Sequence, residues 1–224
     1  IEPKRALELF KGICNLGHSE GCLEVVRLRA ALDDTYEGMT SDTCDLCKPN
    51  VQRACAMCIA LKFDGRNQEN IRGEWFERSK KACSEGEPLG CRLSGRLVAE
   101  GRGVVADLRD AGKWFNQGCN AGDMVACRLL AELYIKGRGV VRSLSEARAL
   151  LERSCKGLDP VSCRELGLMY ITGKGLPVNS RQGNKFFEHG CLWGDAESCT
   201  HLGWSFREGR GTSKDEIRAA NLFQ

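Results

Sequence analysis

The cysteines of this 224-residue chain recur at a fixed interval. Six pairs of cysteines each have seven residues between the two members, and from Cys47 onward the first cysteine of each pair recurs every 36 residues. A fixed period of roughly 20–50 residues indicates a repeat array, in which each repeat is one supersecondary unit. The pairs are Cys14 and Cys22, Cys47 and Cys55, Cys83 and Cys91, Cys119 and Cys127, Cys155 and Cys163, and Cys191 and Cys199.

Each period also contains two apolar patterns at helical spacing. In the fifth period, Leu150 and Leu151 precede Cys155, and Leu166 and Met169 follow the second cysteine of the pair. Apolar residues at these intervals lie on one face of a helix. Glycine adopts the left-handed conformation that ends a helix, so a Gly-x-Gly segment predicts where the second helix stops. These segments are residues 101–103, 137–139, 173–175 and 209–211.

Each repeat is therefore expected to be a helix, a tight turn and an antiparallel helix. One hairpin cannot bury its apolar face alone, so neighbouring hairpins stack. We predict an all-α fold, an α/α superhelical solenoid of TPR-like hairpins with a concave and a convex side, as one domain over residues 1–224. The predicted repeats are 3–36, 37–70, 71–107, 108–143, 144–179 and 180–215, and residues 216–224 begin a seventh repeat or form a capping helix.

Several motifs of these repeats resemble a known family. The alanine-led first helix, the turn glycine, the Leu-Gly-x-Met-Tyr of residues 166–170 and the Gly-Lys-Gly-Leu of residues 173–176 resemble the Sel1-like repeat family. The paired cysteines resemble its disulfide-bearing branch, the Helicobacter cysteine-rich proteins. The resemblance covers nearly the whole chain and implies a scaffold or adaptor that binds a protein or peptide partner, without a cofactor.

The resemblance also implies an enzymatic alternative. Members of the cysteine-rich branch are described as penicillin-binding or β-lactamase proteins, which would make this chain a cell-wall peptide or β-lactam binding protein with weak activity. The sequence contains no Ser-x-x-Lys, Ser-Asp-Asn or Lys-Thr-Gly motif, so a serine β-lactamase nucleophile is not visible. We therefore expect a non-catalytic protein.

The cysteine spacing favours a disulfide within each hairpin. Cysteines with seven residues between them lie at the end of one helix and the start of the next, where a disulfide can form. Free thiols in a reducing compartment are the alternative, but they leave the regular pairing unexplained. Disulfides predict a secreted or periplasmic protein, with the mitochondrial intermembrane space as the alternative.

Cys44 and Cys58 lie outside the regular pattern. They flank Cys47 and Cys55 at a distance of three residues on each side, which places Cys44 opposite Cys58 in an antiparallel hairpin. A second disulfide is one interpretation. Four thiolates could instead bind zinc or another soft metal, in a metal- or cofactor-handling assembly factor, or one pair could be redox-active.

Charge and hydropathy exclude other classes. The formal net charge is +3, which does not predict nucleic-acid binding. No stretch approaches the roughly 20 apolar residues of a membrane span, so we expect a soluble chain, in a mature or trimmed form because no signal-peptide pattern opens it. The sequence does not predict an oligomeric state.

Candidate interaction residues lie on the first helices and on the loops between repeats. The outward positions of the first helices predict a partner-binding face, and a large apolar residue in a turn, Trp193, predicts contact with a partner or packing on a neighbouring repeat. The basic residues between paired glycines form a possible ridge for an acidic partner or an anionic surface, or are solvated side chains. The face comprises Lys113, Asn116, Arg148, Glu152, Lys185, Glu188 and Trp193, and the ridge comprises Arg66, Arg102, Arg138, Lys174 and Arg210.

Overall fold

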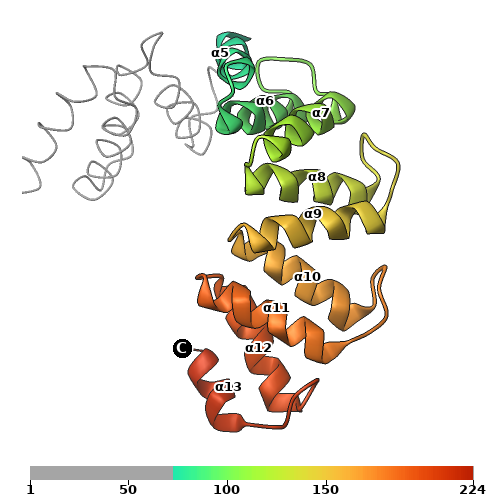
Figure 1. Cartoon of the computed structure of the whole chain (residues 1–224), viewed down its shortest axis with the longest axis vertical. Helices are drawn as coiled ribbons and strands as arrows, with labels where there is room; N and C mark the ends of the chain where they lie inside the picture. The colour runs from blue at the N-terminus through green and yellow to red at the C-terminus, as the bar shows by residue number, and fades with distance from the viewer. Residues whose placement is uncertain (1–72, 224) are drawn as a thin grey trace, which may run out of the picture. The chain divides into compact units, whose positions relative to one another are not determined.

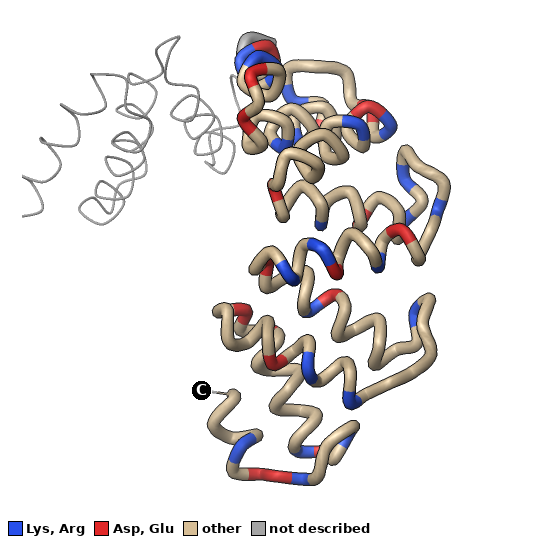
Figure 2. Tube along the Cα trace, viewed as in Figure 1, with Lys and Arg blue, Asp and Glu red and all other residues tan. Residues whose placement is uncertain are grey.

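A computed structural model describes residues 73–223 of the chain, and every regular element in that range is an α-helix (Figure 1). The helices come in pairs of nearly equal length, joined alternately by a short turn and by a longer loop, and Figure 2 marks the charged residues on the same trace. The all-α fold class is confirmed. The helices are α5 (Gly73–Ser84), α6 (Pro88–Glu100), α7 (Leu108–Asn120), α8 (Met124–Lys136), α9 (Leu144–Lys156), α10 (Pro160–Thr172), α11 (Ser180–Leu192), α12 (Ala196–Glu208) and α13 (Glu216–Leu222).

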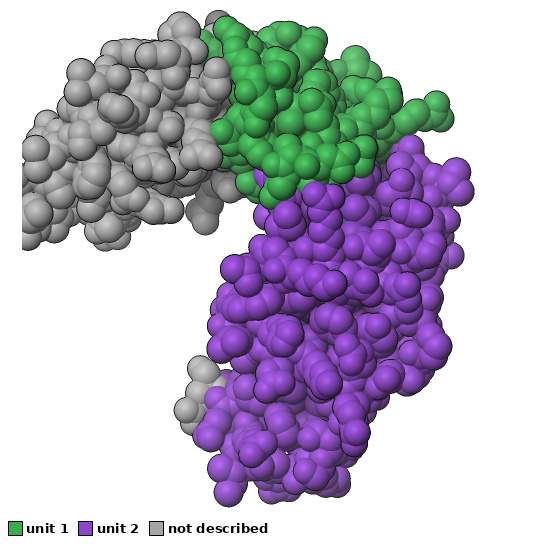
Figure 3. Space-filling view, viewed as in Figure 1, with its two compact units in different colours: residues 1–122 green, residues 123–224 purple. Residues whose placement is uncertain are grey.

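The described residues fall into two compact units, one that ends at Gly122 and one that begins at Asp123, which Figure 3 colours green and purple. In the first unit, α6 packs against both α5 and α7. In the second unit, each helix from α8 to α13 packs against the next one along the chain. Consecutive antiparallel helices therefore bury their apolar faces against their neighbours, as a helical repeat requires. The predicted repeat boundaries stay a prediction.

Polar caps and glycines set the ends of the second helices. Asp159 precedes α10, and its side chain accepts a hydrogen bond from the backbone N–H of Ser162. Such a cap satisfies one of the N–H groups that the first helical turn leaves without a partner. The helix ends at Gly173, whose φ of 71° lies in the left-handed region. The α8 and α12 helices begin after Asp123 and Asp195 and end at Gly137 and Gly209 in the same way.

The core of the second unit is built from the inward faces of α8, α9 and α10. Leu151 and Leu166 are at most 1% exposed, and Met169 is 3% exposed. Tyr170 and Phe186 stack at the side of this cluster, with ring centroids 5.5 Å apart. Burial of such side chains stabilises the fold by about 1.5–3 kcal/mol each. The apolar positions that the sequence pattern places in the core are therefore buried together.

A small residue on each second helix receives a large residue of the next first helix. A Cβ built on Gly167 would lie 2.4 Å from the Cε1 atom of Phe187, so only glycine leaves room for the ring. Gly95 faces Phe115 in the first unit in the same way, with a distance of 2.5 Å. These contacts fix how closely consecutive hairpins approach, because the ring fills the space that the missing side chain leaves.

Disulfides close the hairpins at the short turn. Cys155 and Cys163 are bonded, with Cα atoms 4.8 Å apart, at the end of α9 and the start of α10. The bonds Cys83–Cys91 and Cys191–Cys199 join α5 to α6 and α11 to α12, each with a Cα separation of 4.6 Å. Cys119 and Cys127 are also disulfide-bonded. The interpretations of Cys14, Cys22, Cys44, Cys47, Cys55 and Cys58 concern residues outside the described range.

The turn between α9 and α10 has an unusual backbone. Leu158 has a φ of 70° and a side chain that is 63% exposed. The corresponding residues of other turns are glycines, Gly86 and Gly194, each with a φ of 90°. A branched side chain in the left-handed region is sterically unfavourable, so this turn holds strain that the glycine turns avoid.

Candidate partner-binding surface

The predicted face of the second unit lies on α9 and α11. These helices turn Leu151 and Phe187 into the core, at 1% and 2% exposure. Glu152 is partly exposed, and Lys185 and Glu188 are exposed. Glu152 and Glu188 are one period of 36 residues apart, so they occupy equivalent positions on successive first helices. The structure thus brings a repeated, charged row to the outer side of these helices.

Two of the predicted residues contact each other on α9. Arg148 Nε lies 3.6 Å from Glu152 Oε1, and the two side chains are 42% and 37% exposed. Such an exposed pair contributes less than about 1 kcal/mol to stability. Its small contribution means that a partner could replace this pairing with its own charged groups at little cost.

The predicted residues of the first unit lie on α7. Lys113 and Asn116 are exposed, and Lys113 Nζ lies 3.1 Å from Asp110 Oδ1. The other oxygen of Asp110 accepts a hydrogen bond from the indole nitrogen of Trp114 at 3.3 Å. Asp110 therefore contacts two side chains of the next helical turn, Lys113 and Trp114.

Trp193 differs from the other predicted residues because its side chain packs on the hydrophobic core. It ends α11 and packs against the core cluster that contains Ala147 and Leu166. Its ring centroid lies 5.6 Å from that of His189. The side chain therefore contributes to packing between hairpins, and only part of its surface faces solvent.

One carboxylate of α7 has a perturbed pKa. Asp107 caps the helix, and the backbone N–H groups of Asp110 and Arg109 donate hydrogen bonds to it at 3.2 and 2.8 Å. These bonds, the one from Asp110 first, lower the pKa of Asp107 below its usual range because they stabilise the charged form. The cap is strongest when the carboxylate is ionised.

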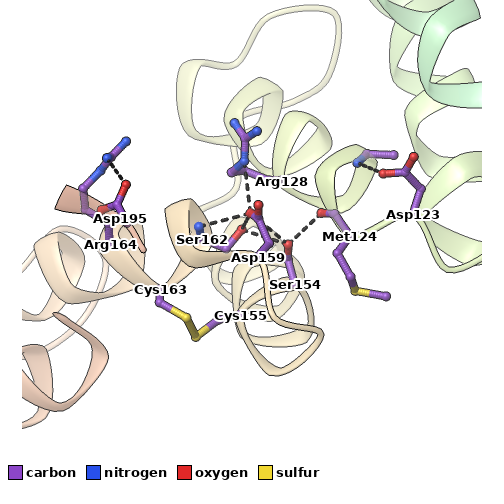
Figure 4. A network of polar contacts seen from close by, with 11 residues as sticks. Asp123, Met124, Arg128, Ser154, Cys155, Asp159, Ser162, Cys163, Arg164 and Asp195 are labelled. Atoms are coloured by element: carbon purple, nitrogen blue, oxygen red, sulfur yellow. Dashed lines mark hydrogen bonds and ion pairs between the residues drawn. A yellow bond between two sulfur atoms is a disulfide. The ribbon is translucent and has the colours of Figure 1, made fainter. Parts of the chain in front are cut away.

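The sequence analysis missed a buried polar network in the second unit (Figure 4). Asp159 is 8% exposed, and its Oδ2 atom accepts hydrogen bonds from Arg128 Nε at 3.1 Å and from the Ser162 hydroxyl at 2.5 Å. The Ser154 and Ser162 hydroxyl oxygens lie 2.8 Å apart, and Ser154 donates to the Met124 carbonyl at 2.6 Å. The network ties the start of α10 to both α8 and α9.

The same contact recurs one repeat later. Arg164 Nη1 lies 2.6 Å from Asp195 Oδ1 and 3.0 Å from Glu197 Oε2. The sequence carries a signal for this ladder, since Arg128 and Arg164 each follow the second cysteine of a pair directly and are 36 residues apart. The arginine and aspartate side chains are at most 23% exposed, so these contacts stabilise the fold, and the exposed row on α9 and α11 is the candidate surface.

Three further findings concern possible metal ligands, a histidine and membrane spans in the described range. Among residues 73–223, no group of three or more His, Cys, Asp or Glu is arranged to hold a metal ion. His201 stacks on Phe187 with ring centroids 5.0 Å apart, which gives this imidazole a packing role. None of the helices between residues 73 and 223 has the length and apolar character that crossing a membrane requires.

Stacked, disulfide-closed helical hairpins define a class, the α/α repeat proteins. The sequence pattern of the Sel1 repeat matches residues 89–123, 125–157, 160–191 and 196–224, more than half of the chain. The chain belongs to the Sel1 repeat family. The resemblance to Sel1-like repeats and the prediction of a disulfide-closed helical solenoid are thereby confirmed.

Solved structures share this fold. The chain is similar to a Sel1 repeat protein from Oxalobacter formigenes, with a TM-score of 0.76, 22% identity, and coverage of 92% of this chain and 82% of that one. It is also similar to c5321, described as a protective antigen of uropathogenic Escherichia coli with an SLR fold, with a TM-score of 0.73, 22% identity, and coverage of 97% and 47%. Helicobacter pylori cysteine rich protein B matches half of this chain, 50%, and 86% of its own, with 26% identity and a TM-score of 0.45. No curated protein matches the sequence.

Proposed function

We propose that this chain is a non-catalytic scaffold that binds a protein or peptide partner on the solvent-facing side of its first helices, as the concave face of the array. Sel1 repeats typically mediate protein interactions. The observation that carries the proposal is the glutamate that recurs at an equivalent position, Glu152 on α9 and Glu188 on α11, with the exposed Lys185 also on α11. The opposite faces of these two helices are anchored in the core by the buried residues Leu151 and Phe187.

Rigid presentation is the proposed mechanism. The first helices are joined to the second helices by disulfides such as Cys155–Cys163, so their backbone is already ordered before a partner arrives. Binding then costs less conformational entropy than it would for a flexible surface. A partner segment of complementary charge would lie across successive first helices, along this proposed concave face.

The disulfides indicate an oxidising compartment. We place the scaffold outside the cytoplasm, secreted or in a bacterial periplasm. A partner would accordingly be another extracytoplasmic protein or peptide.

Site-specific photo-crosslinking tests the proposed face. A photoreactive amino acid is placed at Glu152 or Glu188 on the first helices, and as a control at Glu132 or Thr200, which are exposed on the second helices α8 and α12. Each variant is expressed with export from the cytoplasm, so that its disulfides form, and is then irradiated. We expect adducts of one defined mass at the first-helix positions only, and competition by excess unlabelled protein.

Two further observations decide the outcome. Charge reversal at Glu152 and Glu188 together should abolish the adduct that a reactive group at Lys185 forms, while the melting temperature stays unchanged because these side chains are solvent-exposed. Adducts of equal yield on both faces, or on the second helices alone, would contradict the proposal.

A further inference from the structure

The second unit has three loops that join one hairpin to the next, residues 137–143, 173–179 and 209–215. All three begin with the same backbone geometry, because their first and third residues are glycines with φ between 63° and 75°. The residue between each glycine pair is basic and exposed. Three equivalent loops therefore present a cation at the same place in each repeat, at Arg138, Lys174 and Arg210.

The charge of these loops is almost entirely of one sign. They contain five basic residues and one acidic residue, and the acidic residue, Asp215, caps α13 and pairs with Arg218 at 3.2 Å. Figure 2 shows the basic segments in blue on the loops between α8 and α9 and between α10 and α11. The basic residues are Arg138, Arg142, Lys174, Arg210 and Lys214.

Four of these five cations have no carboxylate partner among residues 73–223. Arg210 pairs with Glu208, and Arg142 donates a hydrogen bond to the backbone carbonyl of Ile135, but no ion pair is formed by Arg138, Arg142, Lys174 or Lys214. The turns at the opposite ends of the hairpins, residues 157–159 and 193–195, contain no basic residue, and their Asp159 and Asp195 are paired with arginines. The three loops therefore contain five basic residues and these two turns none.

Exposed aliphatic side chains accompany the cations. Val141 is 88% exposed and Val178 is 66% exposed, in the same two loops as Arg138 and Lys174. A valine that projects from a loop offers a protruding apolar group rather than a pocket. Cations with protruding apolar groups beside them match the interface of an anionic bilayer, where phosphates attract the cations and the apolar groups enter the headgroup boundary.

We propose that this loop edge, defined by the five basic residues together with Val141 and Val178, binds the surface of an anionic phospholipid membrane. The edge would hold the scaffold against the membrane while the first-helix face remains available to a partner. An acidic peptide is the less favoured ligand, because it would satisfy the cations but provide no apolar layer for the two valines. The proposal does not depend on the partner-binding function.

The expected contribution of each cation follows from membrane electrostatics. A basic residue near an anionic surface strengthens binding about fivefold, so loss of Arg138 and Lys174 should weaken it roughly 25-fold. Salt should weaken binding to the same surface, because the attraction is screened over roughly 10 Å at 0.1 M ionic strength. Removal of the two valines should weaken binding several-fold without changing the salt dependence.

Vesicle co-sedimentation of the oxidised full chain tests the proposal. Phosphatidylcholine vesicles with and without phosphatidylglycerol are compared for the wild type, Arg138→Gln/Lys174→Gln and Val141→Ser/Val178→Ser. The matched control is Lys80→Gln/Lys156→Gln, which removes the same charge from exposed positions outside the loop edge. A charge-preserving variant, Arg138→Lys/Lys174→Arg, separates loss of charge from any change in fold.

Binding that requires phosphatidylglycerol, falls in the Gln and Ser variants and persists in the control and charge-preserving variants supports the proposal. Equal binding to both vesicle types, or an equal loss in the Lys80→Gln/Lys156→Gln control, overturns it. Binding of a polyglutamate peptide by the same cations, with no binding to vesicles, also overturns it and assigns the edge to an acidic protein partner.

Discussion

Substitution of Gly167 by alanine should destabilise the second unit although alanine favours helices. The added Cβ would lie 2.4 Å from Phe187 Cε1 and 2.5 Å from Cδ1, well inside the contact distance of about 3.5–4.0 Å between carbon atoms. Overpacking of this kind costs about 1–3 kcal/mol. The helix propensity of alanine offsets about 1 kcal/mol. We expect a net loss of about 0–2 kcal/mol in the free energy of unfolding.

The chain itself supplies the compensating change. One repeat earlier, the equivalent positions hold Ala131 and Leu151, which are 0% and 1% exposed. Phe187→Leu alone should cost about 1–2 kcal/mol because it leaves a cavity over the glycine. The double variant Gly167→Ala/Phe187→Leu recreates the earlier pair, so its cost should fall below about 1 kcal/mol.

Urea unfolding of the oxidised full chain, followed by far-ultraviolet circular dichroism, measures the cycle. The reverse swap, Ala131→Gly with Leu151→Phe, serves as the matched control and should show the same compensation. In each cycle, the cost of the double variant is compared with the sum of the costs of the two single variants. Agreement to within about 0.5 kcal/mol in both cycles would refute the reasoning, because it would mean that the two sites are independent. The packing of ring against glycine would then not determine the spacing of the hairpins.

Three further predictions concern the turns and caps. Leu158→Gly should raise stability by about 0.5–1 kcal/mol because it relieves a left-handed leucine, and Gly194→Leu should lower it, as thermal melting will show. Asp159→Ala should lower the free energy of unfolding, measured by chemical denaturation, by about 2–4 kcal/mol, because it leaves buried hydrogen-bond donors without an acceptor. The cap variant Ser143→Ala, whose hydrogen bond is exposed, should lower it by only about 1 kcal/mol. The stabilisation by Asp107 should be present above about pH 4 and be lost as pH falls through its lowered folded-state pKa, whereas Asp107→Asn should show no such dependence in the amide exchange of the first turn of α7.

The repeat architecture was predictable because its determinants are local. Cysteines, glycines and apolar residues each recur at 36 residues, and Leu151, Leu166 and Met169 occupy the buried positions that helical spacing predicts. Helix ends were predictable for the same reason, since Gly137 and Gly173 act within their own helices. Local signals of this kind need no knowledge of which hairpin packs on which.

The polar ladder and the strained turn were not predicted, because the period marks these positions without showing what each side chain contacts or which backbone conformation it adopts. Arg128 donates a hydrogen bond to Asp159, which is 31 residues away along the chain. In the sequence alone, an arginine beside a cysteine is equally compatible with a solvated side chain. Leu158 occupies a glycine position, so only the backbone geometry reveals its strain. The exposed row on α9 and α11 was predictable as a surface, whereas the identity of its partner is not encoded in any spacing.

The disulfides also determine what happens when the backbone is cut. Cys155–Cys163 spans the turn, so a protease that cleaves after Lys156 leaves both strands of the nicked hairpin covalently joined. Cleavage after Arg138 or Lys174 falls in a loop that lies outside the segments closed by Cys155–Cys163 and Cys191–Cys199. Cleavage at a turn therefore does not separate the two fragments until a reductant is present, whereas cleavage at a loop divides the chain into pieces that only non-covalent packing can hold together.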